Sequence, residues 1–208
     1  MHIVAAIMLG LGLSAACGLR VFVPMLVLSI ASKAGLVGLT PSLAWLGSNE
    51  GIVCLSVATV LEIVAYKVPW LDHFLDMVAT PAAVIAGAIV TANQIGAVTS
   101  VHPMVQWSCA IIVGGGLAGV VQIGTVATRA ASTVVTGGIA NPIISGFQSL
   151  ASIVVSILAI VVPVLGALFA LCVVGAAVWL ISRWRRGRQV RPPVAAVPGN
   201  GAGNSPIS

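Results

Sequence analysis

The stretch IVAAIMLGLGLSAACGLRVFVPMLVLSIA at residues 3–31 decides the fold class, because it is strongly apolar and Arg20 is its one charged residue. A membrane-spanning helix needs about 20 consecutive apolar residues, and this run is longer. It is also too long for the apolar core of a secretory signal and lacks preceding basic residues. Arg20 and Pro24 interrupt the run, so we expect a broken helix or a helix followed by a re-entrant piece.

The composition of the whole chain agrees with this segment. The 208 residues include nine Lys or Arg and four Asp or Glu, which is 6% charged, while 59% are hydrophobic. A soluble globular domain carries about 25% charged residues, and so few charges cannot cover the surface of one. The composition therefore predicts an all-α, polytopic integral membrane helical bundle without a separate soluble domain.

Further apolar runs predict about five membrane spans in total. They lie at residues 51–68, 75–95, 104–128 and 150–181, and the last is long enough that it must tilt or break near Pro163. Residues 35–50 are rich in turn-forming residues and predict a loop. Residues 129–148 are semipolar and rich in small side chains, which indicates a second interrupted or re-entrant segment.

Basic residues gather near the C-terminus, at Arg183, Arg185, Arg186, Arg188 and Arg191. We predict a transmembrane domain at 1–182 and a disordered, basic and then Pro/Gly-rich tail at 183–208. The positive-inside rule places this tail in the cytoplasm, where the arginines contact anionic headgroups. The protein is then expected in the inner (plasma) membrane.

Charge in the remaining 182 residues sums to zero, because four basic and four acidic residues balance: Arg20, Lys33, Lys67 and Arg129 against Glu50, Glu62, Asp72 and Asp76. The net charge of +5 therefore belongs to the tail and does not predict nucleic-acid binding. Five simple spans would put Lys33 inside and Lys67 outside. A re-entrant segment at 18–33 would change that assignment.

Two segments resemble each other within the chain. GLGLSAACGLR at 10–20 and GGGLAGVVQIGTVATR at 114–129 both lead to an arginine and precede an interrupted segment. Interrupted helices at matching places in two halves are typical of inverted-repeat transporters. Gly and Ala bias alone also produces such similarity, so the sequence leaves both explanations open. The three glycines at 114–116 are expected to allow close helix packing.

Charged residues inside apolar runs are costly and are the first functional candidates. Arg20 is expected either to bind an anion or phosphate, or to form a buried pair with an acid. Asp76 is a candidate for binding a cation, carrying a proton or forming a salt bridge with Arg20 or Arg129. Glu62 has no well-placed partner in its own helix, so we expect its partner on another helix.

Other polar residues extend this candidate set. Asp72 is expected to cap the helix that follows Pro69, and it shares a helix face with Asp76. The segment 129–142 includes Thr136, Gly137 and Asn141, which we expect either to line a pathway or to support close packing.

Enzyme chemistry is not indicated. His73 lies beside two aspartates, but the spacing does not match a metal-binding motif. We expect no metal, no cofactor and no catalytic residues.

The stretches GLRVFVP at 18–24, EIVAYKVPWLDHFLD at 62–76 and STVVTGGIANP at 132–142 resemble, in combination, a family of small bacterial membrane proteins, domain of unknown function 4126. The resemblance covers residues 10–182 and implies a polytopic inner-membrane protein without a settled activity. It also implies that the family motif includes these residues: Arg20, Pro24, Glu62, Asp72, Asp76, Thr136, Gly137, Asn141 and Pro142. The Arg-x-Phe-x-Pro stretch at 20–24 further resembles the re-entrant Arg/Pro motifs of DedA-type lipid-phosphate translocases, although their second arginine is missing nearby.

Two functional hypotheses follow. In the first, the protein is a transporter or channel for an anion, a lipid phosphate or an ion, coupled to protons or cations through intramembrane Arg and carboxylate groups. In the second, it is a non-transporting scaffold or assembly factor whose charges lock helices together. Expected partners are the lipid bilayer, an anion, a lipid phosphate or protons, and in a homo-oligomer a second copy of the chain.

Overall fold

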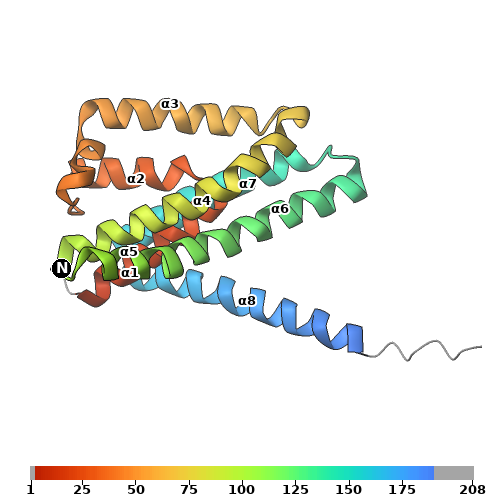
Figure 1. Cartoon of the computed structure of the whole chain (residues 1–208). Helices are drawn as coiled ribbons and strands as arrows, with labels where there is room; N and C mark the ends of the chain where they lie inside the picture. The colour runs from red at the N-terminus through yellow and green to blue at the C-terminus, as the bar shows by residue number, and fades with distance from the viewer. Residues whose placement is uncertain (1–2, 190–208) are drawn as a thin grey trace, which may run out of the picture.

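The computed structural model describes the backbone of residues 3–189, and the side chains of this range except those at 69–73, 180, 181 and 184–189. Every regular element in that range is helical (Figure 1). The elements are α1 (Ile3–Leu19), α2 (Phe22–Lys33), η1 (Pro41–Gly47), α3 (Asn49–Ala65), α4 (Pro69–Val98), α5 (Pro103–Cys109), η2 (Ala110–Gly115), α6 (Gly116–Thr136), α7 (Asn141–Val161) and α8 (Pro163–Gln189).

Within the described residues, three helical segments are long and apolar enough to cross a membrane: Phe74–Val98, Pro103–Thr136 and Asn141–Val161. The bent pair η1 and α3 makes a fourth candidate if both helices form one span. Three more apolar helices are shorter: Ile3–Leu19, Phe22–Lys33 and Pro163–Trp179. The all-helical fold is confirmed over the described residues, with three or four candidate membrane spans, while the number of about five spans stays a prediction.

The first apolar run is broken at Arg20, as its sequence predicts. α1 and α2 are 17 and 12 residues long, or about 26 and 18 Å, less than the hydrocarbon core of about 30 Å. Ile3 and Gly38 each line a pocket that also includes Val98, at the end of α4. Both ends of the α1–α2 pair therefore lie at one end of the bundle, and Arg20 lies at the tip of a helical hairpin (Figure 1).

Small residues let α1 occupy the centre of the bundle. A Cβ atom built on Gly18 would lie 2.4 Å from the carbonyl oxygen of Ala118, and one on Gly12 would lie 2.9 Å from the Cα of Gly166. Both distances are shorter than real Cβ contacts. The glycines of α1 are therefore required for the close approach of α6 and α8.

α1 and the helical segment 103–136 run in the same direction. The Ser14 hydroxyl donates to the Gly114 carbonyl, and Gly18 contacts Ala118 further along both helices. An inverted repeat relates equivalent helices in opposite directions, so this pair does not confirm the predicted repeat. Gly114 and Gly115 pack closely against α4, as expected, whereas Gly116 faces open space.

The other predicted breaks are also present. α6 ends at Thr136, and Gly137 and Gly138 take left-handed conformations with φ of +63° and +88° before α7 begins. α7 ends at Val161 and α8 begins at Pro163, so the long final run is broken at the proline. α8 extends as a helix to Gln189, past the predicted domain boundary at 182.

Because α1 and α2 form a hairpin, the basic residues are distributed between the two ends of the bundle differently from what five simple spans predict. α8 lies beside α1 in the same direction, because Gly166 contacts Gly12 and Ala170 packs with Ala15. The C-terminal end of α8 and the tip of the hairpin therefore lie toward the same end of the bundle. The connection between α3 and α4 also lies at this end (Figure 1). Lys67 lies at that end, and Lys33 lies at the opposite one.

Candidate functional site

Two buried arginines meet at one tyrosine. Arg20 and Arg129 are 1% and 2% exposed, and their guanidinium carbons lie 4.0 and 4.3 Å from the centroid of the Tyr66 ring. A cation over an aromatic face gains about 0.5–2 kcal/mol. Tyr66, at the C-terminal end of α3 and itself buried, therefore joins charges from α1 and α6. Sequence reasoning missed this residue, although it is the one tyrosine of the chain.

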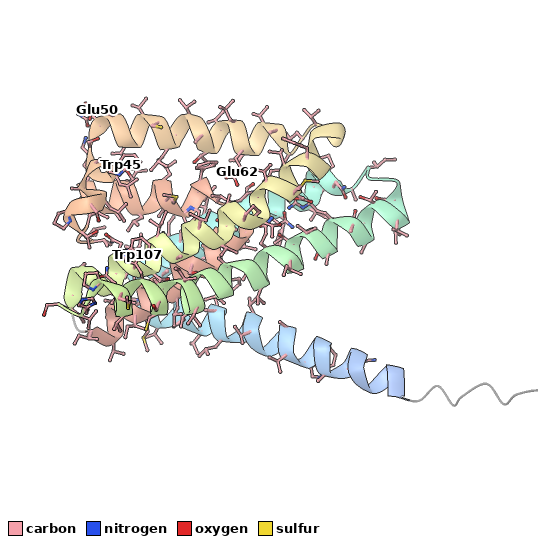
Figure 2. All side chains as sticks on the ribbon, viewed as in Figure 1. Trp45, Glu50, Glu62 and Trp107 are labelled. Carbon is pink, nitrogen blue, oxygen red and sulfur yellow. The ribbon has the colours of Figure 1, made fainter. Side chains whose placement is uncertain are left out.

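Glu62 lies one helical turn before Tyr66 and binds the start of α2. Its two carboxylate oxygens accept hydrogen bonds from the backbone N–H groups of Val21 and Phe22, at 2.8 and 3.1 Å. The first N–H groups of a helix lack partners within it, and a negative charge there is favourable. The expectation that Glu62 has its partner on another helix is confirmed, but these partners are backbone groups. Figure 2 shows Glu62 on α3.

Arg20 connects the hairpin tip to α7. Its Nη2 donates to the carbonyl oxygen of Ser145 at 3.0 Å and to the Ser145 hydroxyl. Because Arg20 is buried, its guanidinium is enclosed by protein groups. Together with Tyr66, these contacts join α1, α3 and α7 at a single side chain.

Arg129 and Asp76 form a salt bridge between α6 and α4. The Nη2–Oδ1 distance is 2.6 Å, with the Asp76 side chain 15% exposed. One of the alternatives expected for Asp76, a salt bridge with Arg129, is confirmed. The bridge joins α4 to α6 and therefore constrains both helices.

A pocket of about 330 Å³ opens beside this salt bridge. It is lined by side chains from α4, α6 and the start of α7: Asp76, Met77, Thr80, Val126, Arg129, Ala130, Thr133 and Asn141. The Asn141 Nδ2 donates to the Thr133 hydroxyl oxygen at 2.9 Å. This volume is at the lower end of small-ligand pockets, so it fits an ion or a small polar group.

Comparison with known proteins identifies the family. The model of a domain of unknown function, DUF4126, matches residues 7–183. The chain belongs to the DUF4126 family. No curated protein and no solved structure matches it. The resemblance found in the sequence motifs is thereby confirmed, while the short likeness to DedA-type proteins has no support from these comparisons.

The remaining predicted site residues of this DUF4126 protein are spread around the cluster. Pro24 is fully buried in the first turn of α2. Thr136 is exposed and donates to the Ser132 carbonyl oxygen at 2.8 Å. Gly137 caps α6 in the left-handed conformation. Thr136 and Gly137 do not line the pocket. They belong to the connection between α6 and α7 that leads to Asn141.

The predicted capping role of Asp72 is wrong. α4 begins at Pro69 with Val68 in the N-cap position, so Asp72 lies inside the helix. Proline is favoured in the first turn because its missing N–H is not needed there, and this moves the helix start forward. The Asp72 side chain lies outside the described residues.

Two further expectations concern the tail and metals. Arg183 is exposed, with its guanidinium 5.2 Å from the centroid of the Trp179 ring. The side chains of Arg185, Arg186 and Arg188 lie outside the described residues. Among the residues that the structure describes, no group of three or more His, Cys, Asp or Glu side chains is placed to hold a metal ion.

Proposed function

We propose that this DUF4126 protein is a membrane transporter or channel-like protein whose pathway includes the pocket beside the Arg129–Asp76 salt bridge. The observation that carries the proposal is the joint placement of this ion pair, Thr133 and Asn141 around a 330 Å³ pocket. Ionisable groups within membrane helices commonly mark ion or substrate pathways. The proposed cargo is an anion, a lipid phosphate or an ion.

The depth of Asp76 supports a pathway inside the membrane. α4 has 30 residues and is therefore about 45 Å long, which matches the hydrocarbon core with both interfacial regions. If the helix is centred in the bilayer, Asp76 lies about 11 Å from the midplane and thus inside the hydrocarbon core. A pocket that contains an ion pair at this depth has little structural value unless a polar species enters it.

The chemistry of the salt bridge supports an anionic cargo coupled to protons. A guanidinium binds carboxylate and phosphate oxygens with two parallel hydrogen bonds. An anion that enters the pocket would compete with the Asp76 carboxylate for Arg129. Protonation of Asp76 would release Arg129 for the anion, which couples the two movements.

Flux measurements with the full chain in liposomes test the proposal. The probes are chloride, inorganic phosphate, a fluorescent phospholipid and a pH-sensitive dye for protons. We expect wild-type protein to move at least one probe faster than empty liposomes, and Asp76→Asn to lower that flux about tenfold or more. Glu50→Gln, at an exposed acid on the opposite end of the bundle, is the matched control and keeps the wild-type flux. An unchanged flux in Asp76→Asn, or none in the wild type, contradicts the proposal.

A scaffold is the second candidate, and a different observation favours it. Arg20 contacts Ser145 and Tyr66, and Glu62 binds the start of α2, so both side chains hold helices together. In a pure scaffold, substitutions at Arg20 and at Asp76 would both lower the folded yield, and neither would alter a flux.

We further propose an inner-membrane location with the C-terminus in the cytoplasm. Lys67 and Arg183 lie at the same end of the bundle, and the other end carries Lys33 with Glu50. Lys67 and Lys33 balance each other between the two ends, so the orientation rests on the arginines at 183–191. The bilayer, the transported ion and, in a homo-oligomer, a second copy are the proposed partners; no enzymatic role and no cofactor are proposed.

A further inference from the structure

A second pocket lies at the opposite end of the bundle, between the start of α1, the end of α4 and α5. It has a volume of about 270 Å³. Apolar side chains make up most of its wall: Ile3, Ala6, Ile7, Leu11, Ile95, Val98, Val101, Val105 and Val113. A dry, apolar pocket of this kind suits a hydrocarbon chain.

One polar side chain stands out in this wall. Gln94 is 1% exposed, and its Nε2 has no hydrogen-bond partner. A buried donor without an acceptor costs about 1–3 kcal/mol, so an acceptor that reached Gln94 would recover that free energy. The neighbouring Gln106 differs, because its Nε2 donates to the Ala92 carbonyl oxygen at 2.8 Å. Gln94 therefore lacks the acceptor that its neighbour has.

A third pocket meets the apolar one at Gln94. Its volume is about 500 Å³, and Leu36, Gly38, Gln94, Ala97 and Val98 line it. Gln94 and Val98 belong to both walls. The Gln94 amide thus lies where an apolar pocket joins a wider space at the end of the bundle.

The depth of Gln94 matches that of lipid ester groups. With α4 centred as above, Gln94 lies about 16 Å from the midplane, at the edge of the hydrocarbon core. Exposed Trp45 and Trp107 lie at this end of the bundle (Figure 2). Tryptophan is enriched at the membrane–water interface, so these side chains support the same depth.

We propose that this pocket is a binding site for a diacyl glycerolipid of the surrounding membrane. One acyl chain fills the apolar pocket, the Gln94 Nε2–H donates to the ester carbonyl oxygen, and the glycerol and headgroup occupy the wider space beside Gly38. The proposal concerns the end of the bundle away from Arg20 and Asp76, and it does not depend on transport.

Native mass spectrometry of the full chain tests this assignment with two probes, dioleoyl phosphatidylglycerol and its dialkyl ether analogue. The two lipids share headgroup and chains, but only the diacyl form has ester carbonyls. One hydrogen bond predicts that wild-type protein binds the diacyl lipid about fivefold more tightly. Ile7→Trp, which fills the apolar pocket, is expected to weaken binding of both lipids.

Matched variants at two buried glutamines isolate the contact. Gln94→Met keeps the side-chain volume and is expected to bring the diacyl-to-ether ratio to about one. Gln122→Met is the control, because Gln122 is also buried with its Nε2 lacking a partner but does not line this pocket. It should keep the fivefold ratio. Equal binding of both lipids by the wild type, a preference that survives Gln94→Met, or one that is lost in Gln122→Met overturns the proposal.

Discussion

The two arginines at Tyr66 have similar burial but different surroundings. Arg20 lies at the tip of the α1–α2 hairpin, where protein groups on α3 and α7 surround it. Arg129 lies in the middle of α6 and borders a pocket together with the more exposed Asp76. The Tyr66 ring therefore lies between Arg20, which protein groups enclose, and Arg129, which borders a pocket.

This difference teaches how one cluster can serve both folding and function. A charge whose neighbours are all protein groups stabilises helix packing and offers nothing to a ligand. A charge that borders a pocket can exchange its partner for an entering ion. The sealed side, defined here as Arg20, Cys17 and Ser145, and the pocket side, defined as Arg129, Asp76 and Thr133, should respond differently to substitution.

The largest loss of stability is expected for Arg20→Ala on the sealed side. The substitution removes the two hydrogen bonds to Ser145 and the contact with Tyr66, and leaves a cavity, so we expect a loss of about 3 kcal/mol or more. Thermal unfolding of purified protein in detergent, together with the yield of monodisperse material, measures it. Arg183→Ala is the control and should unfold like the wild type. An unchanged melting temperature for Arg20→Ala would mean that the hairpin tip is not held by this side chain.

Glu62→Gln is expected to have the next largest effect. The amide can accept from only one of the Val21 and Phe22 N–H groups, and the negative charge near the start of α2 is lost. We expect a loss of about 2 kcal/mol in the free energy of unfolding. Glu50→Gln, at an exposed position of the same helix, should cost much less. Equal effects of the two substitutions would remove the special role of Glu62.

Substitutions of Tyr66 test whether its ring joins Arg20 on the sealed side to Arg129 on the pocket side. Tyr66→Leu removes the ring from both arginines and should cost about 1–2 kcal/mol, whereas Tyr66→Phe keeps the ring and should cost less. Thermal unfolding of both variants gives the comparison. A Phe variant as unstable as the Leu variant would show that the hydroxyl, and not the ring, holds the arginines.

The smallest change in stability is expected on the pocket side for Thr133→Val. It removes the acceptor of the Asn141 Nδ2 hydrogen bond at a partly exposed position, so we expect a loss of about 1 kcal/mol or less. The liposome flux, in contrast, should fall severalfold because the pocket wall loses a polar group. A variant with normal flux would place the pathway away from Thr133.

Much of this arrangement could be predicted from sequence because charge inside an apolar run is costly wherever it occurs. Arg20, Glu62, Asp76 and Arg129 were identifiable on that ground, and the break after Arg20 followed from Arg20 and Pro24 together. Tyr66 and Ser145 could not be identified, since their roles depend on how α3 and α7 pack against α1. The helix start before Asp72 was misplaced because the proline at 69 begins the helix instead of ending the preceding loop.

Thiol labelling compares the two sides most directly. Cys17 lies three residues before Arg20 and is fully buried on the sealed side, so it is kept, while the exposed Cys54, Cys109 and Cys172 are replaced by alanine. Thr133→Cys is then added in the pocket, and the folded protein in its membrane is treated with a small, charged methanethiosulfonate reagent. We predict that the variant with Cys17 as its single cysteine takes up no label. The variant that also carries Thr133→Cys should take up one label. Labelling of Cys17, or protection of the cysteine at 133, would contradict the division into a sealed side and a pocket side.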